Sequence, residues 1–148
     1  MESIRTCMFV THDAGRIRAR PMAAIPDRAE NSVWFFTART SAKPEELSGD
    51  QRCCLMFHHT DGGVFLSLSG GTRLSRDTEL MRRKWDREAE LWFPKGPCHP
   101  DVMLLHFVPE AAEYWIRPGD FDSVAREVRA ARAEGREPRI GENARINF

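Results

Sequence analysis

The chain has 148 residues, of which 41% are hydrophobic and 30% are charged. This length fits one domain spanning residues 1–148 with a core of its own, and the composition excludes a disordered chain. Lys and Arg total 22 and Asp and Glu also total 22, so the formal net charge is zero. We therefore expect neither a general nucleic-acid binder nor a membrane-surface binder, and no apolar run is long enough to span a bilayer.

The cysteines and histidines are not spaced for disulfide or metal chemistry. Cys53 and Cys54 are adjacent, and no C-x-x-C pair occurs. His58 and His59 are also adjacent, and neighbouring strand residues point to opposite faces, so they do not share a metal ion. The N-terminal M-E-S-I-R-T-C lacks the apolar stretch of a secretion signal. We expect reduced thiols, no bound metal and a cytoplasmic protein.

The first half of the chain is predicted to form short strands joined by turns. Pro26–Asn31 is a turn by composition, and Asp61–Gly63 is typical of a tight hairpin. Gly70 and Gly71 indicate a bulge or bend. A short helix is expected at Pro44–Leu47, with Ser41 as its N-cap. The predicted strands are Thr6–Thr11, Ile17–Ile25, Ser32–Thr37, Arg52–His58 and Val64–Leu74.

The second half is predicted to add two helices and three strands. The charge pattern of Asp77–Glu90 favours a helix, and a loop rich in Pro and Gly follows it. The remaining elements are strands at Val102–Val108 and Ala112–Ile116, a helix at Phe121–Glu134 and a short terminal strand at Ala144–Phe148. Many short strands with few helices indicate a mainly β protein, a small β-barrel with peripheral helices. A doubly wound sheet is excluded, because no helix separates the first three strands.

A phosphate-and-ring pocket is the most specific chemical suggestion in the chain. Arg18 and Arg20 share one face of a predicted strand, and Ser41 and Lys43 follow the aromatic strand W-F-F-T. A guanidinium fork matches phosphate oxygens, a lysine adds a mobile charge, and the first turn of the next helix offers free N–H groups. The alternative is that the arginines are simply solvated on an outer strand face. The full pattern favours a pocket for a phosphorylated, planar cofactor.

These motifs resemble a known family. R-A-R-P-M at Arg18–Met22, W-F-F-T at Trp34–Thr37 and S-A-K at Ser41–Lys43 resemble the FMN-binding split barrels. Within them the chain is most similar to the general-stress-protein branch, which is related to pyridoxamine 5'-phosphate oxidase. The resemblance covers nearly the whole chain, continuing through Val64–Gly70, Leu91–Gly96, Pro109–Trp115 and Gly141–Asn143.

The resemblance implies a homodimer with two FMN sites built across the subunit interface. It assigns cofactor contacts to Arg18, Arg20, Pro21, Met22, Phe36, Thr37, Ser41 and Lys43, to Phe65 from the partner subunit, and to Trp115. Ala42 stands where the related oxidase has an arginine, so Arg18 or Arg20 must supply more of the positive charge. Arg117 follows Trp115, but the Arg-x-His pattern that binds the oxidase's substrate is missing. Oxidation of pyridoxamine phosphate is therefore not expected.

Three functions fit these observations. The first is a stress-related, FMN-dependent oxidoreductase of unknown substrate, in which no catalytic acid or base is identified. The second is a flavin-binding or flavin-sensing protein without turnover. The third is a split barrel that binds haem or a deazaflavin, and His58, His59 or His106 would then be the candidate haem ligands.

Overall fold

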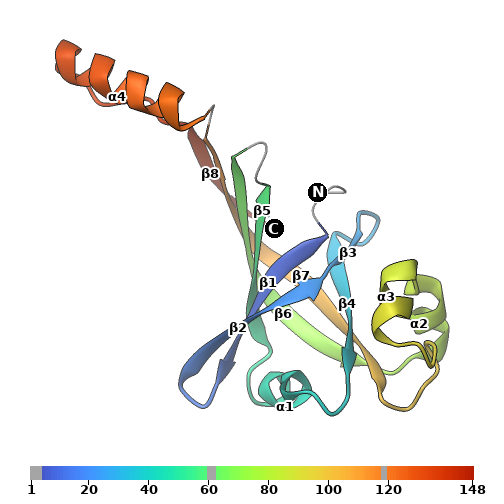
Figure 1. The fold of residues 1–148 in the computed structure, drawn as a ribbon. Coiled ribbons are helices and arrows are strands. Elements are labelled where there is room, and N and C mark those ends of the chain that lie inside the picture. Colours follow the sequence, from blue (N-terminus) through green and yellow to red (C-terminus); the bar gives the residue numbers. More distant parts are fainter. Residues whose placement is uncertain (1–4, 60–62, 118–119) are drawn as a thin grey trace.

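The computed structural model describes residues 5–59, 63–117 and 120–148, and they form one antiparallel sheet with helices around it (Figure 1). The hydrogen-bonded strand order is β2-β1-β5-β6-β7-β4-β3, and β8 pairs with β7. The strands are β1 (Thr6–Asp13), β2 (Arg16–Ala23), β3 (Ile25–Asp27), β4 (Ser32–Ala38), β5 (Arg52–His59), β6 (Val64–Ser75), β7 (Val102–Ile116) and β8 (Glu142–Asn147). The helices are α1 (Ala42–Gly49), α2 (Thr78–Lys84), α3 (Arg87–Trp92) and α4 (Phe121–Glu134).

The sheet curls into an open barrel around an apolar core. Its two end strands, β2 and β3, do not pair with each other in the described residues. Phe9, Phe35, Leu55 and Phe107 are completely buried inside the curl, and the rings of Phe9 and Phe35 meet edge to face at 5.1 Å. Each such side chain contributes about 1.5–3 kcal/mol by leaving water. The prediction of a mainly β barrel with peripheral helices is confirmed.

A second, smaller core lies between the sheet and the helix pair α2–α3. Trp34 and Phe36 point out of the barrel from β4 and pack with Met81 of α2, Ala89 of α3 and Leu104 of β7. Consequently β4 is buried on both faces, which explains its continuous apolar sequence. This core fixes α2 and α3 against one side of the barrel (Figure 1).

The prediction of two separate strands at Val102–Val108 and Ala112–Ile116 is wrong, because both belong to one strand, β7. It runs unbroken, because Pro109, which cannot donate a ladder hydrogen bond, stands opposite Gly70 at a bulge. The register shifts there, so that Ser69 pairs with Ala111 and Glu110 is left over. The predicted bulge at Gly70–Gly71 is thus confirmed. The first half of β7 pairs with β4 and the second half with β8.

Other differences have local causes. The predicted helix Asp77–Glu90 is broken into α2 and α3, because Trp85 is extended and the Asp86 carboxylate accepts a hydrogen bond from Ala89 N at 2.8 Å, starting a new helix. The predicted strand Ile17–Ile25 is divided at Ala24 into β2 and β3, so the following turn begins after Asp27.

The C-terminal elements agree with the sequence. The helix α4 has its predicted bounds, and β8 begins two residues before the predicted strand Ala144–Phe148. Figure 1 shows α4 standing away from the barrel, beyond the ends of β7 and β8. None of the described helices combines the length and hydrophobicity that crossing a membrane requires. Of the predicted hairpin turn, Asp61 and Gly62 lie outside the described residues.

The close approach at the bulge gives a stability prediction. A Cβ added at Gly70 would lie 2.1 Å from Val108 O and 2.9 Å from Pro109 Cα, both backbone atoms that cannot move aside cheaply. We expect Gly70→Ala to lower the free energy of unfolding by about 1–3 kcal/mol or more, measured by urea denaturation.

Gly71→Ala is the matched control for this experiment. None of the described residues places a heavy atom within 4 Å of a Cβ added at Gly71. The control should change the free energy of unfolding by no more than about 0.5 kcal/mol. Equal losses in both variants would show that the bulge is not tightly packed.

Candidate functional site

A cavity of about 350 Å³ lies where the ends of β1, β2 and β4 meet α1 and α3. Its volume falls within the range of small-molecule sites, about 300–1,000 Å³. The predicted site residues that line it are Pro21, Met22, Phe36, Thr37, Ser41 and Lys43. Residues separated by more than twenty positions in the chain are therefore brought together as expected.

The helix α3 and Phe93, which follows it, supply a further wall of this cavity. Glu88, Trp92 and Phe93 line it, together with Thr6 from β1. Trp92 has 73% of its surface exposed, an unusual position for so large an apolar side chain. Phe36 on the opposite wall is held by an edge-to-face contact with Trp85 at 4.9 Å. Aromatic rings thus border the cavity from two separate elements.

The start of α1 is left open toward the cavity. Ser41 occupies the N-cap position, as predicted, but its hydroxyl donates to Ala38 O at 2.8 Å instead of capping the helix. Since a hydroxyl has one proton, Thr37 must be the donor in the 3.1 Å contact between Thr37 Oγ1 and Ser41 Oγ. The described structure gives the backbone N–H groups of the first turn of α1 no side-chain cap.

The other helices are capped differently. α2, α3 and α4 each follow an aspartate whose carboxylate accepts hydrogen bonds from first-turn N–H groups, at 2.8–3.0 Å. Such a carboxylate occupies the position where an external anion would bind. An eight-residue helix with free N–H groups at a cavity wall is therefore suited to an anion such as a phosphate.

Lys43 adds a positive charge beside this helix start. It is half-buried, and within the described part of the chain it forms no salt bridge. Burial lowers the pKa of the Lys43 ammonium, nearby Arg20 lowers it further, and Glu46 acts in the opposite direction. A partly desolvated cation without a direct partner is stabilised by an incoming anion.

Arg18 and Arg20 are occupied by a buried carboxylate, Glu46 of α1. The Glu46 side chain is 2% exposed, and its Oε1 lies 3.2 Å from Arg18 Nη1. Arg20 donates to both Glu46 and Thr11, and the Thr11 hydroxyl donates to Glu46 Oε2 at 2.6 Å. Neither arginine lines the cavity. Their contact with a cofactor phosphate therefore stays a prediction, while their role in holding α1 is visible.

Glu46 itself was missed in the sequence. The available signal was its spacing, since Lys43 and Glu46 lie three residues apart and share one side of a helix. Burial works to raise the pKa of Glu46, but the hydrogen bonds from Thr11 and Arg20 and the charges of Arg20 and Arg18 outweigh it. The net result is a pKa below the ordinary value, so the carboxylate is ionised at neutral pH.

Phe65 and Trp115 lie elsewhere, on the outer face of the sheet. They are directly opposite each other on β6 and β7, and they are 36% and 40% exposed. The ring of His58 stacks on Phe65 at 4.3 Å. Met56 on β5 is also exposed on this sheet. Within one chain, neither Phe65 nor Trp115 lines the cavity. An exposed apolar cluster of this kind is typical of an interaction surface.

The Glu46 network gives a pH-dependent prediction. We expect Glu46→Gln to lower the free energy of unfolding at pH 7 by roughly 3 kcal/mol, because the partly buried Arg20 loses this counter-ion, while Arg18 keeps only Asp13. The folded-state pKa of Glu46 is lowered, so its contribution is present above the unfolded value of 4.5 and is lost as pH falls below it.

Urea denaturation at pH 7 and at pH 3.5 measures this difference. The gap between Glu46→Gln and the unmodified protein should shrink at the lower pH. Glu45→Gln, one residue away and exposed, is the control and should have little effect at either pH. A gap for Glu46→Gln that is the same at both pH values would contradict the ionised, ion-paired carboxylate.

Comparisons with known proteins agree with this architecture. The chain is 26% identical over 127 residues to protein bli-3 of Neurospora crassa, covering 78% of this chain and 61% of that protein. The chain therefore spans less than two thirds of the length of this curated relative. It resembles the protein from Jannaschia sp. CCS1 that is assigned as general stress protein 26, with a TM-score of 0.74, 28% identity and coverage of 99% of this chain and 92% of that one.

A third similar protein carries a ligand in its name. The general stress FMN/FAD binding protein of Xanthomonas citri superposes with a TM-score of 0.71 at 27% identity, over 80% of this chain and 84% of that one. With this likeness, the open barrel is the split-barrel fold. The model of the family described as "Pyridoxamine 5'-phosphate oxidase like" matches residues 1–139. The chain therefore belongs to the pyridoxamine 5'-phosphate oxidase-like family.

Proposed function

We propose that the protein is a homodimeric flavin-dependent oxidoreductase that binds FMN in the cavity between β2, β4, α1 and α3. The observation that carries this proposal is the uncapped start of α1 beside Lys43, at a cavity bordered by aromatic rings. Membership of the family and the named ligand of the Xanthomonas citri protein support a flavin. FMN would supply the electron- or hydride-transfer chemistry, and the protein would bind and orient it.

The phosphate end of the site would be formed by α1. A phosphate monoester carries about −1.5 to −2 charges at pH 7, which matches a helix N-terminus together with one ammonium group. Lys43 would bind the phosphate, and Ser41 could turn its hydroxyl from Ala38 O toward it. Arg20, held by Glu46, adds positive potential behind Lys43. This arrangement accounts for the absence of an arginine at Ala42.

The ring end of the site would be formed by β2, β4 and α3. Met22 and Phe36 offer apolar contacts, and the backbone of β2 at Pro21 runs beside the cavity, where its polar groups can meet the edge of a flavin. Trp92 stands at the α3 wall and would limit access of water to the ring. Burial of a reactive ring favours directed transfer of electrons over leakage to solvent.

The second subunit would complete the site. Phe65 and Trp115 form an exposed apolar pair on the sheet, too exposed for a monomer to leave in water without cost. In the proposed dimer this pair would cover the cavity of the partner, giving two equivalent sites. Haem binding is less well supported, because no histidine is among the described residues that line the cavity.

The phosphate-binding role of Lys43 can be tested with two ligands. We expect Lys43→Ala to weaken FMN binding about 10- to 100-fold, the equivalent of one charge-assisted hydrogen bond. Riboflavin lacks the phosphate, so its affinity should be unchanged in the same variant. Quenching of flavin fluorescence on titration with protein measures both affinities.

Lys95→Ala is the matched control, since Lys95 is exposed and lies outside the cavity. The lowered pKa of Lys43 adds a second readout. The Lys43 ammonium loses its proton below the ordinary lysine range, so FMN affinity should fall as pH rises toward 10, and this fall should be smaller in Lys43→Ala. Equal losses of FMN and riboflavin affinity would place the phosphate elsewhere.

Turnover is tested separately from binding. With FMN bound, we expect NADH or NADPH to bleach the flavin absorbance under anaerobic conditions, and admitted air to restore it. The rate of bleaching in a stopped-flow spectrometer is the measurement. Flavin that binds tightly but is not reduced by either nicotinamide would favour the flavin-binding or flavin-sensing alternative.

A further inference from the structure

Two rings are stacked at the second core. Trp34 on β4 and His106 on β7 stand directly opposite each other in the sheet, and their rings lie nearly parallel, with the centroids 3.9 Å apart. Lys84, the last residue of α2, places its ammonium group 5.1 Å from the centre of the Trp34 ring. The stack therefore joins the sheet to the helix pair α2–α3, and α3 supplies part of the wall of the proposed flavin cavity.

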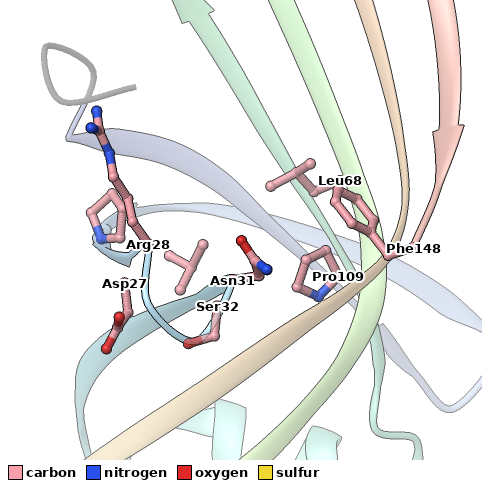
Figure 2. Close-up of a pocket in the computed structure, with 9 residues that line it drawn as sticks. Asp27, Arg28, Asn31, Ser32, Leu68, Pro109 and Phe148 are labelled. Atoms are coloured by element: carbon pink, nitrogen blue, oxygen red, sulfur yellow. The ribbon is translucent and has the colours of Figure 1, made fainter.

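Lys84 is held beside this stack by an ion pair. Its ammonium donates to the carboxylate of Asp27 at the end of β3, and the two side chains are only 18% and 16% exposed. In the close-up of this turn, the Asp27 carboxylate points away from Pro109 and Phe148 (Figure 2). It is thus turned away from these cavity residues and bound to Lys84. The positive charge of Lys84 is consequently fixed next to the Trp34 ring.

The packing around His106 favours a neutral imidazole. Its Nε2 atom is buried and has no hydrogen-bond partner among the described residues, and the same is true of Trp34 Nε1. In the neutral ring the proton can sit on Nδ1, whereas protonation would add an N–H and a positive charge at the covered Nε2. A buried, charged donor without an acceptor costs more than a bare ring nitrogen. The covered Nε2 is for the same reason closed to a haem iron.

Burial lowers the pKa of His106, and the surrounding charges act in both directions. Lys84 of α2 and Arg73, which stands directly opposite His106 on β6, lower it further. Glu30 and Asp27 act to raise it, but Glu30 is exposed and Asp27 is paired with Lys84. The net result is a pKa below the ordinary value of 6.5, in agreement with the geometry.

This direction makes the attachment of α2 and α3 sensitive to acid. Because the pKa of His106 is lower in the packed core than in an opened one, the opened form binds the proton first. The packed form therefore loses stability as pH falls below 6.5. Within the described residues, the helix pair is otherwise held by the apolar contacts of the second core, by Lys84 and by the ion pairs that Arg5 makes at the start of α3. So small an attachment belongs to the parts of a protein that open most easily.

We propose that the stack of Trp34 and His106 is a pH-sensitive switch, in which protonation of His106 breaks the stack and releases α2 and α3 from the barrel. Glu88, Trp92 and Phe93 form the wall of the cavity at α3, so release would open that wall and weaken flavin binding. The effect on flavin rests on the proposed function, whereas the release of the helices does not. The protein would hold its cofactor at neutral pH and lose it in acid.

Hydrogen exchange at pH 7.5 and at pH 5.0 tests the release without any cofactor. The full-length protein is compared with His106→Phe, which keeps a ring on Trp34 but cannot be protonated. Relative to this variant, the protection of the α2 and α3 amides should be lower at pH 5.0 than at pH 7.5, by about tenfold for each unit by which the pKa is lowered. His12→Phe, which removes an exposed histidine outside the cavity, is the control and should behave like the unmodified protein.

An NMR titration of the histidine rings measures the switch in the unmodified protein, so the test does not depend on a variant that folds. The His106 signal, identified by its contact with Trp34, should titrate below 6.5, and signals of α2 should shift with it. A midpoint at or above 6.5 would overturn the proposal. Equal protection of α2 and α3 in the unmodified protein and His106→Phe at pH 5.0 would overturn it too.

Riboflavin affinity at the same two pH values tests the effect on the cavity. Riboflavin is the probe because the phosphate of FMN itself titrates near pH 6. The apparent affinity is proportional to the closed fraction, so we expect it to fall about two- to tenfold at pH 5.0 and to stay constant in His106→Phe. Release of the helices without this fall would overturn the link to the cavity. Absence of flavin binding at either pH would contradict the proposed function, and hydrogen exchange would still decide the switch.

Discussion

The buried carboxylate of Glu46 is the constraint on which the proposed flavin site depends. It ties α1 to β1 through Thr11 and to β2 through Arg20 and Arg18, so a short helix with little apolar surface is held in one orientation. That orientation directs the uncapped start of α1 and Lys43 into the cavity. Breaking the network would leave the Arg20 guanidinium without this counter-ion. Arg18 would keep Asp13, and α1 would keep its contact through Leu47 with the barrel core.

The strand β4 lies between the two cores. It is buried on both faces, by the barrel core on one side and by α2 and α3 on the other. Such a strand has little freedom to shift, because movement would disturb two cores at once. Its residues at the cavity wall, Phe36 and Thr37, are therefore held in a fixed position.

Local pattern was sufficient for much of the fold and for bringing six of the predicted residues to one cavity. Turn residues and apolar runs located most strands, and the spacing of Phe36, Ser41 and Lys43 placed them at one cavity because a strand leads directly into a helix. Contacts between distant segments were not predictable in this way. Glu46 meets Thr11 across 35 positions, and Glu88 reaches the cavity because the second core places α3 there.

Two of the wrong element boundaries have different causes, one in a distant strand and one in a local hydrogen bond. In the sequence, Pro109 indicates the end of a strand. In the structure it stands opposite Gly70 at a bulge, where no hydrogen bond from the proline is needed. In the sequence, Asp86 is one more charge in a helical pattern. In the structure its carboxylate accepts a hydrogen bond from Ala89 N and caps the start of α3. The first boundary therefore depended on the partner strand, whereas the second depended on a helix cap only three residues long.

The pairing of β7 with β8 has a consequence for how the family can vary. Ile116 stands opposite Glu142, so the chain leaves the sheet and returns to the same point, and the described residues between these two, with α4 among them, form an insertion within a hairpin. The entropy of closing such a loop rises only slowly with its length. This segment can therefore change in length or sequence during evolution as a separate module. The barrel and the proposed flavin cavity, which none of its described residues lines, would stay unchanged.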